Sequence, residues 1–157
     1  MRRKTILFSS ALLVVIIGGI VAWYIHQVYY FNPFTFKRDD VTTVAWNVYK
    51  NPMQMVIVYQ PTHGAATQYT TENRSEMNYV LSQLKEAKPT SYKPPASGLF
   101  NGQIWIQFRN PKNQNDYADA VLHNNMTVVL LQQVNPVTVT NGLKNFISQK
   151  RSTAKPM

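Results

Sequence analysis

The chain lacks several residues and motifs on which protein chemistry commonly depends. It has no cysteine among its 157 residues, which excludes disulfide bonds, thiolate metal sites, cysteine nucleophiles and a lipoprotein anchor. It has only 6 glycines and no glycine-rich phosphate loop, which excludes the familiar nucleotide-binding designs. Acidic residues are few as well, because 7 Asp and Glu stand against 16 Lys and Arg and leave a net charge of +9.

One long stretch near the N-terminus contains no charged residue. The run from Thr5 to Ile25 provides 21 uncharged residues, and the next charge comes only at Lys37. As a helix this run is roughly 31 Å long, close to the bilayer core of about 30 Å. The sequence therefore predicts a transmembrane helix over Thr5–Ile25. Aromatic residues typical of a membrane interface lie at its end and just beyond it: Trp23, Tyr24, Tyr29 and Tyr30.

The distribution of Lys and Arg predicts the orientation of this helix. Residues 2–4 are all basic, whereas the first cations beyond the helix are Lys37 and Arg38. Positive residues favour the cytoplasmic side, so we expect a single-pass protein of the cell membrane with a cytoplasmic N-terminus and an extracytoplasmic C-terminal domain. The alternative is a cleaved signal peptide. Its apolar region is usually shorter and Ala22 makes a poor cleavage site, so an uncleaved signal anchor is favoured.

Composition divides the chain into five segments. We expect a basic start at residues 1–4, the transmembrane helix at 5–25, an aromatic stalk at 26–40, an α+β domain at 41–149 and a basic tail at 150–157. The domain segment is long enough to bury one core without disulfide bonds.

Hydrophobic periodicity predicts the secondary structure of the domain. Apolar residues alternate in segments 43–49, 103–109 and 117–123, and they dominate 53–59 and 126–133, so we expect five strands. The first two strands should form a hairpin. Helical spacing predicts a helix with Thr70, Thr71 and Asn73 as candidate caps at its start, and a second helix capped by Thr140. The order β-β-α-β-β-β-α favours a small α+β domain with an antiparallel sheet and two helices.

Two aromatic residues mark a candidate binding surface. Residues 88–102 are rich in Pro, Ser and Gly and form a long connection, a kind of segment that is often functional, and Tyr92 lies within it. Trp105 lies on the opposite side of its strand from Ile104 and Ile106. Tyr and Trp are common in the energetic centres of interfaces. The competing interpretation is that a helix covers Trp105.

The element order resembles that of small membrane-anchored or lipid-anchored exported bacterial domains, often called YhfM-like. Four segments carry the resemblance: the strand MQMVIVY, the helix TTENRSEMNYVLSQLKEA, the strand IWIQF and the late strand TVVLLQ. The resemblance spans about residues 41–149 and is one of pattern. It implies a fold and a location but no activity and no site residue, and the chain lacks the lipobox cysteine of the lipid-anchored members.

Residues able to perform acid–base or metal chemistry are sparse. The three histidines show no paired spacing of the zinc-binding kind, so we expect no metal and no cofactor. His123 and Asp119 share one side of the strand 117–123 by period two and are the one candidate pair for a hydrolase-type enzyme. Because few reactive side chains are available, a non-enzymatic role is favoured over catalysis.

The charge surplus indicates which partners are plausible. Residues 37–157 carry 13 basic and all 7 acidic side chains. Such a surplus attracts anionic surfaces over a long range, and no nucleic-acid recognition motif is present. The sequence therefore predicts a non-enzymatic binding or accessory domain acting at the cell surface, in contact with the membrane and with a protein or an anionic cell-wall partner. The alternatives are an accessory subunit that pairs through its transmembrane helix, and the His123–Asp119 enzyme.

Overall fold

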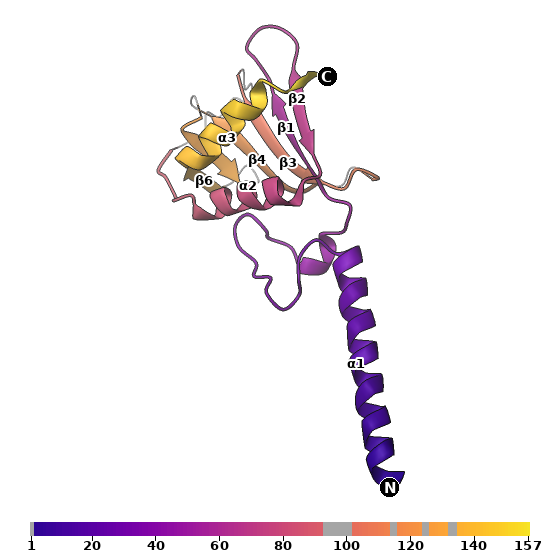
Figure 1. Cartoon of the computed structure of the whole chain (residues 1–157). Helices are drawn as coiled ribbons and strands as arrows, with labels where there is room; N and C mark the ends of the chain where they lie inside the picture. The colour runs from indigo at the N-terminus through magenta and orange to yellow at the C-terminus, as the bar shows by residue number, and fades with distance from the viewer. Residues whose placement is uncertain (1, 93–101, 114–115, 124–125, 132–134) are drawn as a thin grey trace.

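The computed structural model describes residues 2–92, 102–113, 116–123, 126–131 and 135–157, with side chains throughout except at residues 2–11 and 135. A long N-terminal helix, α1 (Arg2–Val28), projects from an α+β domain (Figure 1). The strands of the domain are β1 (Gln54–Tyr59), β2 (Thr67–Thr71), β3 (Ile104–Arg109), β4 (Asp116–His123), β5 (Val128–Leu131), β6 (Asn135–Thr138) and β7 (Lys155–Pro156). Its helices are the short 3₁₀ turn η1 (Trp46–Val48), α2 (Arg74–Glu86) and α3 (Asn141–Arg151).

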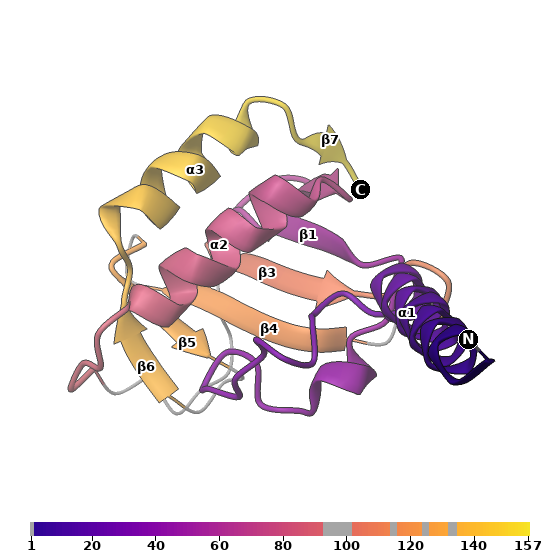
Figure 2. The same cartoon turned by 60° about the horizontal axis from the view of Figure 1, so that its bottom comes forward.

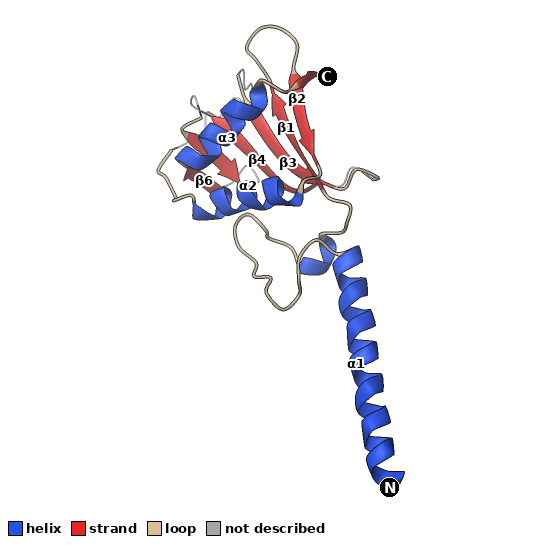
Figure 3. Cartoon of the chain, in the orientation of Figure 1, coloured by secondary structure: helices blue, strands red, loops and turns tan. Residues whose placement is uncertain are grey.

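All seven strands form one antiparallel sheet in the order β6-β5-β4-β3-β1-β2-β7. The helices α2 and α3 lie side by side on one face of this sheet, as Figure 2 shows. Figure 3 shows the same division into a helix layer and a strand layer. The hydrophobic core fills the space between the two layers, and Ile57, Ile106 and Val129 are fully buried at its centre.

Both domain helices begin where their sequences provide a cap. The Asn73 side chain accepts hydrogen bonds from the backbone N–H groups of Ser75 and Glu76, and the Thr140 hydroxyl accepts one from Leu143. These bonds satisfy donors that have no partner within the helix. The apolar stripe of α2 then faces the sheet and consists of Met77, Val80, Leu81 and Leu84.

A charged cluster joins α2, α3 and β2. Lys150 lies 2.6 Å from the Glu76 carboxylate, and the Tyr69 hydroxyl donates a 2.6 Å hydrogen bond to the other oxygen of that carboxylate. Burial acts to raise the pKa of Glu76, but the hydrogen bonds from Lys150 and Tyr69 outweigh this effect and hold that pKa below its ordinary value. The cluster therefore stabilises the folded state while Glu76 is ionised.

Aromatic residues attach the segment after α1 to the domain. The Tyr30 side chain is buried, and its hydroxyl donates a 2.7 Å hydrogen bond to Asn78 on α2. The Arg74 guanidinium lies 4.7 Å from the centre of the Tyr30 ring and bonds the Tyr30 carbonyl. Phe31 and Phe36 pack on the buried ring of Tyr49. The segment 26–40 is therefore part of the folded domain rather than a free stalk.

The structure differs from the predicted strands in one segment that is not a strand and in three strands that the sequence pattern missed. The segment 43–49 is not a strand, because both edges of β1 are occupied by β2 and β3, and its residues 46–48 form η1 instead. The hairpin partner of β1 is β2, a polar strand that the sequence pattern missed. The strands β6 and β7 were also missed, since each is short and contains a proline, which is tolerated at a sheet edge.

The prediction of a transmembrane helix at Thr5–Ile25 is contradicted. Among the residues that the structure describes, no helix is long and apolar enough to cross a membrane. The single-pass, signal-anchor topology and the predicted location in the cell membrane are corrected accordingly.

Removing the central side chain of the core tests this packing. Ile57 has no exposed surface and contacts the helix layer from the middle of the sheet. We expect Ile57→Ala to lower the free energy of unfolding by about 3 kcal/mol, because it removes buried methylene groups and leaves a cavity. Val44→Ala is the control, since Val44 is 37% exposed and lies outside the core cluster. Equal destabilisation by both variants in urea unfolding would contradict the proposed core.

The charged cluster predicts a pH dependence of stability. Because the pKa of Glu76 is lowered in the folded state, the unfolded chain takes up the proton first as pH falls below the ordinary glutamate value. The contribution of this group is therefore present above that value and is lost on acidification. We expect Glu76→Gln to flatten the acid limb of the unfolding free energy, while Glu72→Gln, at an exposed position, leaves it in place. An unchanged acid limb in Glu76→Gln would refute this role.

Candidate functional site

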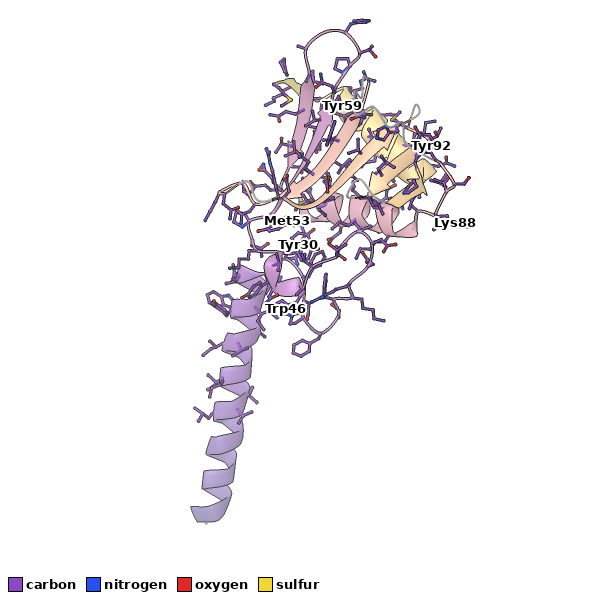
Figure 4. All side chains as sticks on the ribbon, turned by 180° about the vertical axis from the view of Figure 1, so that it is seen from behind. Tyr30, Trp46, Met53, Tyr59, Lys88 and Tyr92 are labelled. Atoms are coloured by element: carbon purple, nitrogen blue, oxygen red, sulfur yellow. The ribbon has the colours of Figure 1, made fainter. Side chains whose placement is uncertain are left out.

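No helix among the described residues covers the second face of the sheet. Figure 4 views the molecule from behind, and the strands there lie in front of α2 and α3. Strand register places a line of side chains across this face, because Val58 pairs with Trp105, Trp105 with Val121, Val121 with Leu130, and Leu130 with Pro136. Directly paired residues point to the same side of a sheet. The line is therefore an apolar row across five strands: Val58, Trp105, Val121, Leu130 and Pro136.

Burial along this apolar row is uneven. Val121 and Leu130 are buried, whereas Val58 and Trp105 are only half-buried. Gln107 and Arg109 follow Trp105 on the same side of β3 by period two, and both are also half-buried. We call the four half-buried residues the Trp105 face: Val58, Trp105, Gln107 and Arg109.

The Trp105 face combines an aromatic ring with a cation. Within the described part of the chain the two ion pairs are Lys85–Asp39 and Lys150–Glu76, so Arg109 belongs to neither of them. Strand register places Asp116 opposite Arg109 and Asp119 opposite Gln107. An arginine fork binds a carboxylate through two parallel hydrogen bonds, and Trp and Arg are enriched where interfaces gain most of their energy. The arrangement is suited to contact with an apolar group beside a carboxylate.

Tyr92, the other aromatic residue of the predicted surface, lies at the edge of the sheet. The backbone N–H of Thr90 donates to the Pro136 carbonyl at 3.1 Å, which brings the chain beside β6 (Figure 4). Pro136 ends the apolar row three strands away from Trp105, a distance of about 14 Å. Tyr92 is half-buried, and residues 93–101 of the predicted loop lie outside the described residues. Tyr92 therefore lies near the β6 end of the apolar row, about three strands away from Trp105.

His123 and Asp119 share a strand but are not adjacent on it. They lie four residues apart on β4, which separates them by about 13 Å along the strand. Burial lowers the pKa of His123, while burial, followed by the charge of Asp116, raises the pKa of Asp119. The His123 ring lies 3.5 Å from the Gln103 side-chain nitrogen. No described geometry brings a proton of one group to the other.

A groove of about 310 Å³ opens where β1 ends and β3 begins. Its described lining includes the buried Gln103 side chain, with an Oε1 that has no hydrogen-bond partner, and the exposed Arg151. This lining contains no carboxylate and no imidazole. The groove therefore offers hydrogen bonds and a positive charge, but no acid–base pair. Across the described residues no group of three His, Asp or Glu side chains is placed to hold a metal ion.

The four predicted interfacial aromatics separate into two pairs. Trp23 and Tyr24 are exposed on α1. Tyr29 packs edge-on against Trp46 at 4.8 Å between ring centres, and Tyr30 is buried in the domain. Tyr29 and Tyr30 therefore serve to attach α1 to the domain, whereas Trp23 and Tyr24 face outward.

Two residues of these surfaces, Arg109 and Phe34, were not predicted from the sequence. Arg109 shares the Trp105 side of β3, and period-two alternation alone would have placed it there. Phe34 is 91% exposed in a turn, and no pattern in the sequence distinguishes it from the partly buried Phe31 and Phe36.

Comparison with family models, with curated proteins and with solved structures found no match to this chain. The resemblance to small exported bacterial domains therefore remains a prediction from pattern. Any function has to be argued from the surfaces of the domain itself.

The buried imidazole predicts a second pH effect. Because burial lowers the pKa of His123, the unfolded chain takes up a proton before the folded chain does as pH falls through the ordinary histidine value of about 6.5. The free energy of unfolding should therefore fall below that pH. We expect His123→Asn to reduce this dependence in urea titrations between roughly pH 7 and pH 5. His63→Gln, in an exposed loop, is the control, and an equal change in both variants would contradict the prediction.

Proposed function

We propose that this protein is a non-enzymatic binding module that holds an acidic protein partner against the Trp105 face. The observation that carries the proposal is a half-buried Trp and a half-buried Arg on the sheet face that no described helix covers. A tryptophan buries a large area on binding at low entropic cost, and the arginine adds a directional contact to a carboxylate.

Charge favours an acidic partner over a second copy of the chain. Residues 37–157 have a surplus of six positive charges, so two copies repel each other at long range. An acidic partner is attracted by the same field, which raises its association rate. Arg109 then provides the local contact that fixes the partner on the face.

A binding role also agrees with the chemistry of the described surfaces. The groove at the end of β1 presents an amide and a guanidinium, and the residues expected for catalysis lie far apart on β4. Catalysis by acid and base needs two groups within hydrogen-bonding reach of one substrate. Binding at the Trp105 face requires only that its side chains keep fixed positions. The strand β3, which carries three of them, pairs with β1 and β4 along its whole length.

Replacing the tryptophan tests the proposal. A photo-reactive amino acid in place of Val58, which pairs with Trp105, should cross-link the partner in cells that produce the full chain. We expect Trp105→Ala to remove this adduct, because loss of such an anchor costs about 2 kcal/mol, roughly thirtyfold in Kd. Trp46→Ala removes a half-buried tryptophan from η1 and should leave the adduct unchanged.

Two further variants separate the chemistry of the contact from folding. Arg109→Glu should abolish the adduct and Arg109→Lys should retain most of it, with both proteins keeping the wild-type unfolding midpoint. The same photo-reactive group at Tyr79, exposed on the helix side, should capture nothing. Equal capture from positions 58 and 79, or an adduct insensitive to Trp105→Ala, would overturn the proposal.

A further inference from the structure

Exposed apolar side chains gather where α1 joins the domain. Trp23 is 64% exposed and Tyr24 55% exposed on the last turns of α1, and Phe34 is 91% exposed in the segment that follows. Phe34 lies beside α1, since it lines a small groove of about 90 Å³ together with Ala22 and Ile25. Val44 and Val48 are exposed in the adjoining segment. We call these five residues the collar: Trp23, Tyr24, Phe34, Val44 and Val48.

Phe34 is held outward by an ordered turn. Its backbone N–H donates to the Asn32 side-chain oxygen at 2.9 Å, and the N–H of Phe36 donates to the Asn32 carbonyl at 2.9 Å. Phe31 and Phe36 on either side pack inward on Tyr49. Water contact with a whole phenyl ring is unfavourable by about 2 kcal/mol relative to burial. A turn that fixes such a ring in solvent indicates a contact outside the chain.

Cations flank the collar on the same segments. Lys37 and Arg38 follow the Phe34 turn, and Lys50 lies beside the end of α1 through its backbone bridge to Tyr29. All three are exposed. Two acids follow in the same segment: Asp39, whose carboxylate lies 2.7 Å from Lys85 and accepts hydrogen bonds from Thr42, and Asp40, which is exposed. Three exposed cations therefore stand against these two carboxylates, one of which is already paired. The collar is therefore an aromatic and apolar surface with a positive rim.

We propose that the collar rests on an anionic lipid bilayer surface. Trp and Tyr rings suit the headgroup level of a bilayer, exposed apolar side chains gain by burial at the acyl boundary, and Lys and Arg are attracted to anionic headgroups. A second copy of the collar would bring like charges together and does not fit this pattern. The contact is made at the surface and requires no membrane-crossing helix. It is independent of the Trp105 face, which consists of different residues on β1 and β3.

The absence of cysteine makes a direct test available. A single Phe34→Cys substitution in the full chain can be labelled with an environment-sensitive fluorophore, and His63→Cys provides the matched control. His63 lies in the β1–β2 loop, at the end of the domain away from α1 (Figure 1). With vesicles of phosphatidylcholine and phosphatidylglycerol in a 3:1 ratio, chosen as about a quarter anionic lipid, we expect the probe at position 34 to shift to the blue and brighten. The probe at position 63 should not respond.

Charge reversal on the rim tests the role of the cations. Lys37→Glu with Arg38→Glu should lower the vesicle partition coefficient by about tenfold or more, since each cation near an anionic surface contributes about fivefold. Vesicles of phosphatidylcholine alone, or added salt, should weaken the wild-type response in the same direction. Trp105→Ala should leave the response unchanged, so this result and that of the partner experiment are distinguishable.

Three outcomes would overturn the inference. One is an equal response at positions 34 and 63, which would mean nonspecific adsorption of the chain. Another is a response that ignores both phosphatidylglycerol and the charge reversal, which would mean that apolar contact alone is at work. The third is a response at position 34 that grows with protein concentration in the absence of vesicles, which would make the occupant a second copy of the chain.

Discussion

Burial of β1 between its two neighbours and under the helix layer is the constraint on which the rest of the domain depends. This strand pairs along its length with β2 on one side and β3 on the other. Its residues Met55, Ile57 and Tyr59 enter the core beneath α2 and α3. Tyr59 also donates a 2.9 Å hydrogen bond to the Ile147 carbonyl on α3. Strand pairing and helix docking therefore meet at one segment, which fixes where the remaining strands must lie.

The asymmetry of the sheet follows from this arrangement. With α2 and α3 both on one face, the other face has to tolerate apolar side chains without helical cover. Val121 and Leu130 are nevertheless buried there, while Val58 and Trp105 keep part of their surface exposed. Half-buried aromatic surface of this kind costs little in the free chain and gains more when a partner excludes the remaining water. The face therefore combines stability with a capacity for contact.

The sequence predicted the elements whose pattern is local, and it missed those that tertiary pairing determines. Alternation in Gln103–Arg109 predicted both the strand β3 and the outward direction of Trp105, because period two needs no partner to be recognised. Alternation in 43–49 predicted a strand that does not exist, since both edges of β1 were already occupied. Val58 joins Trp105 on its face from another strand, β1, and only strand register reveals this neighbour.

The collar and the Trp105 face are coupled through the same segment of backbone. At the end of α1, the N–H of Asn51 donates to the Val28 carbonyl at 2.9 Å, and its side chain donates to the Tyr29 carbonyl at 3.1 Å. Three residues later β1 begins at Gln54, and it carries Val58 of the Trp105 face. Since β1 is fixed on both edges and by the core, the end of α1 is tied to the sheet through this segment. One folded domain therefore carries both of the surfaces for which we propose a contact.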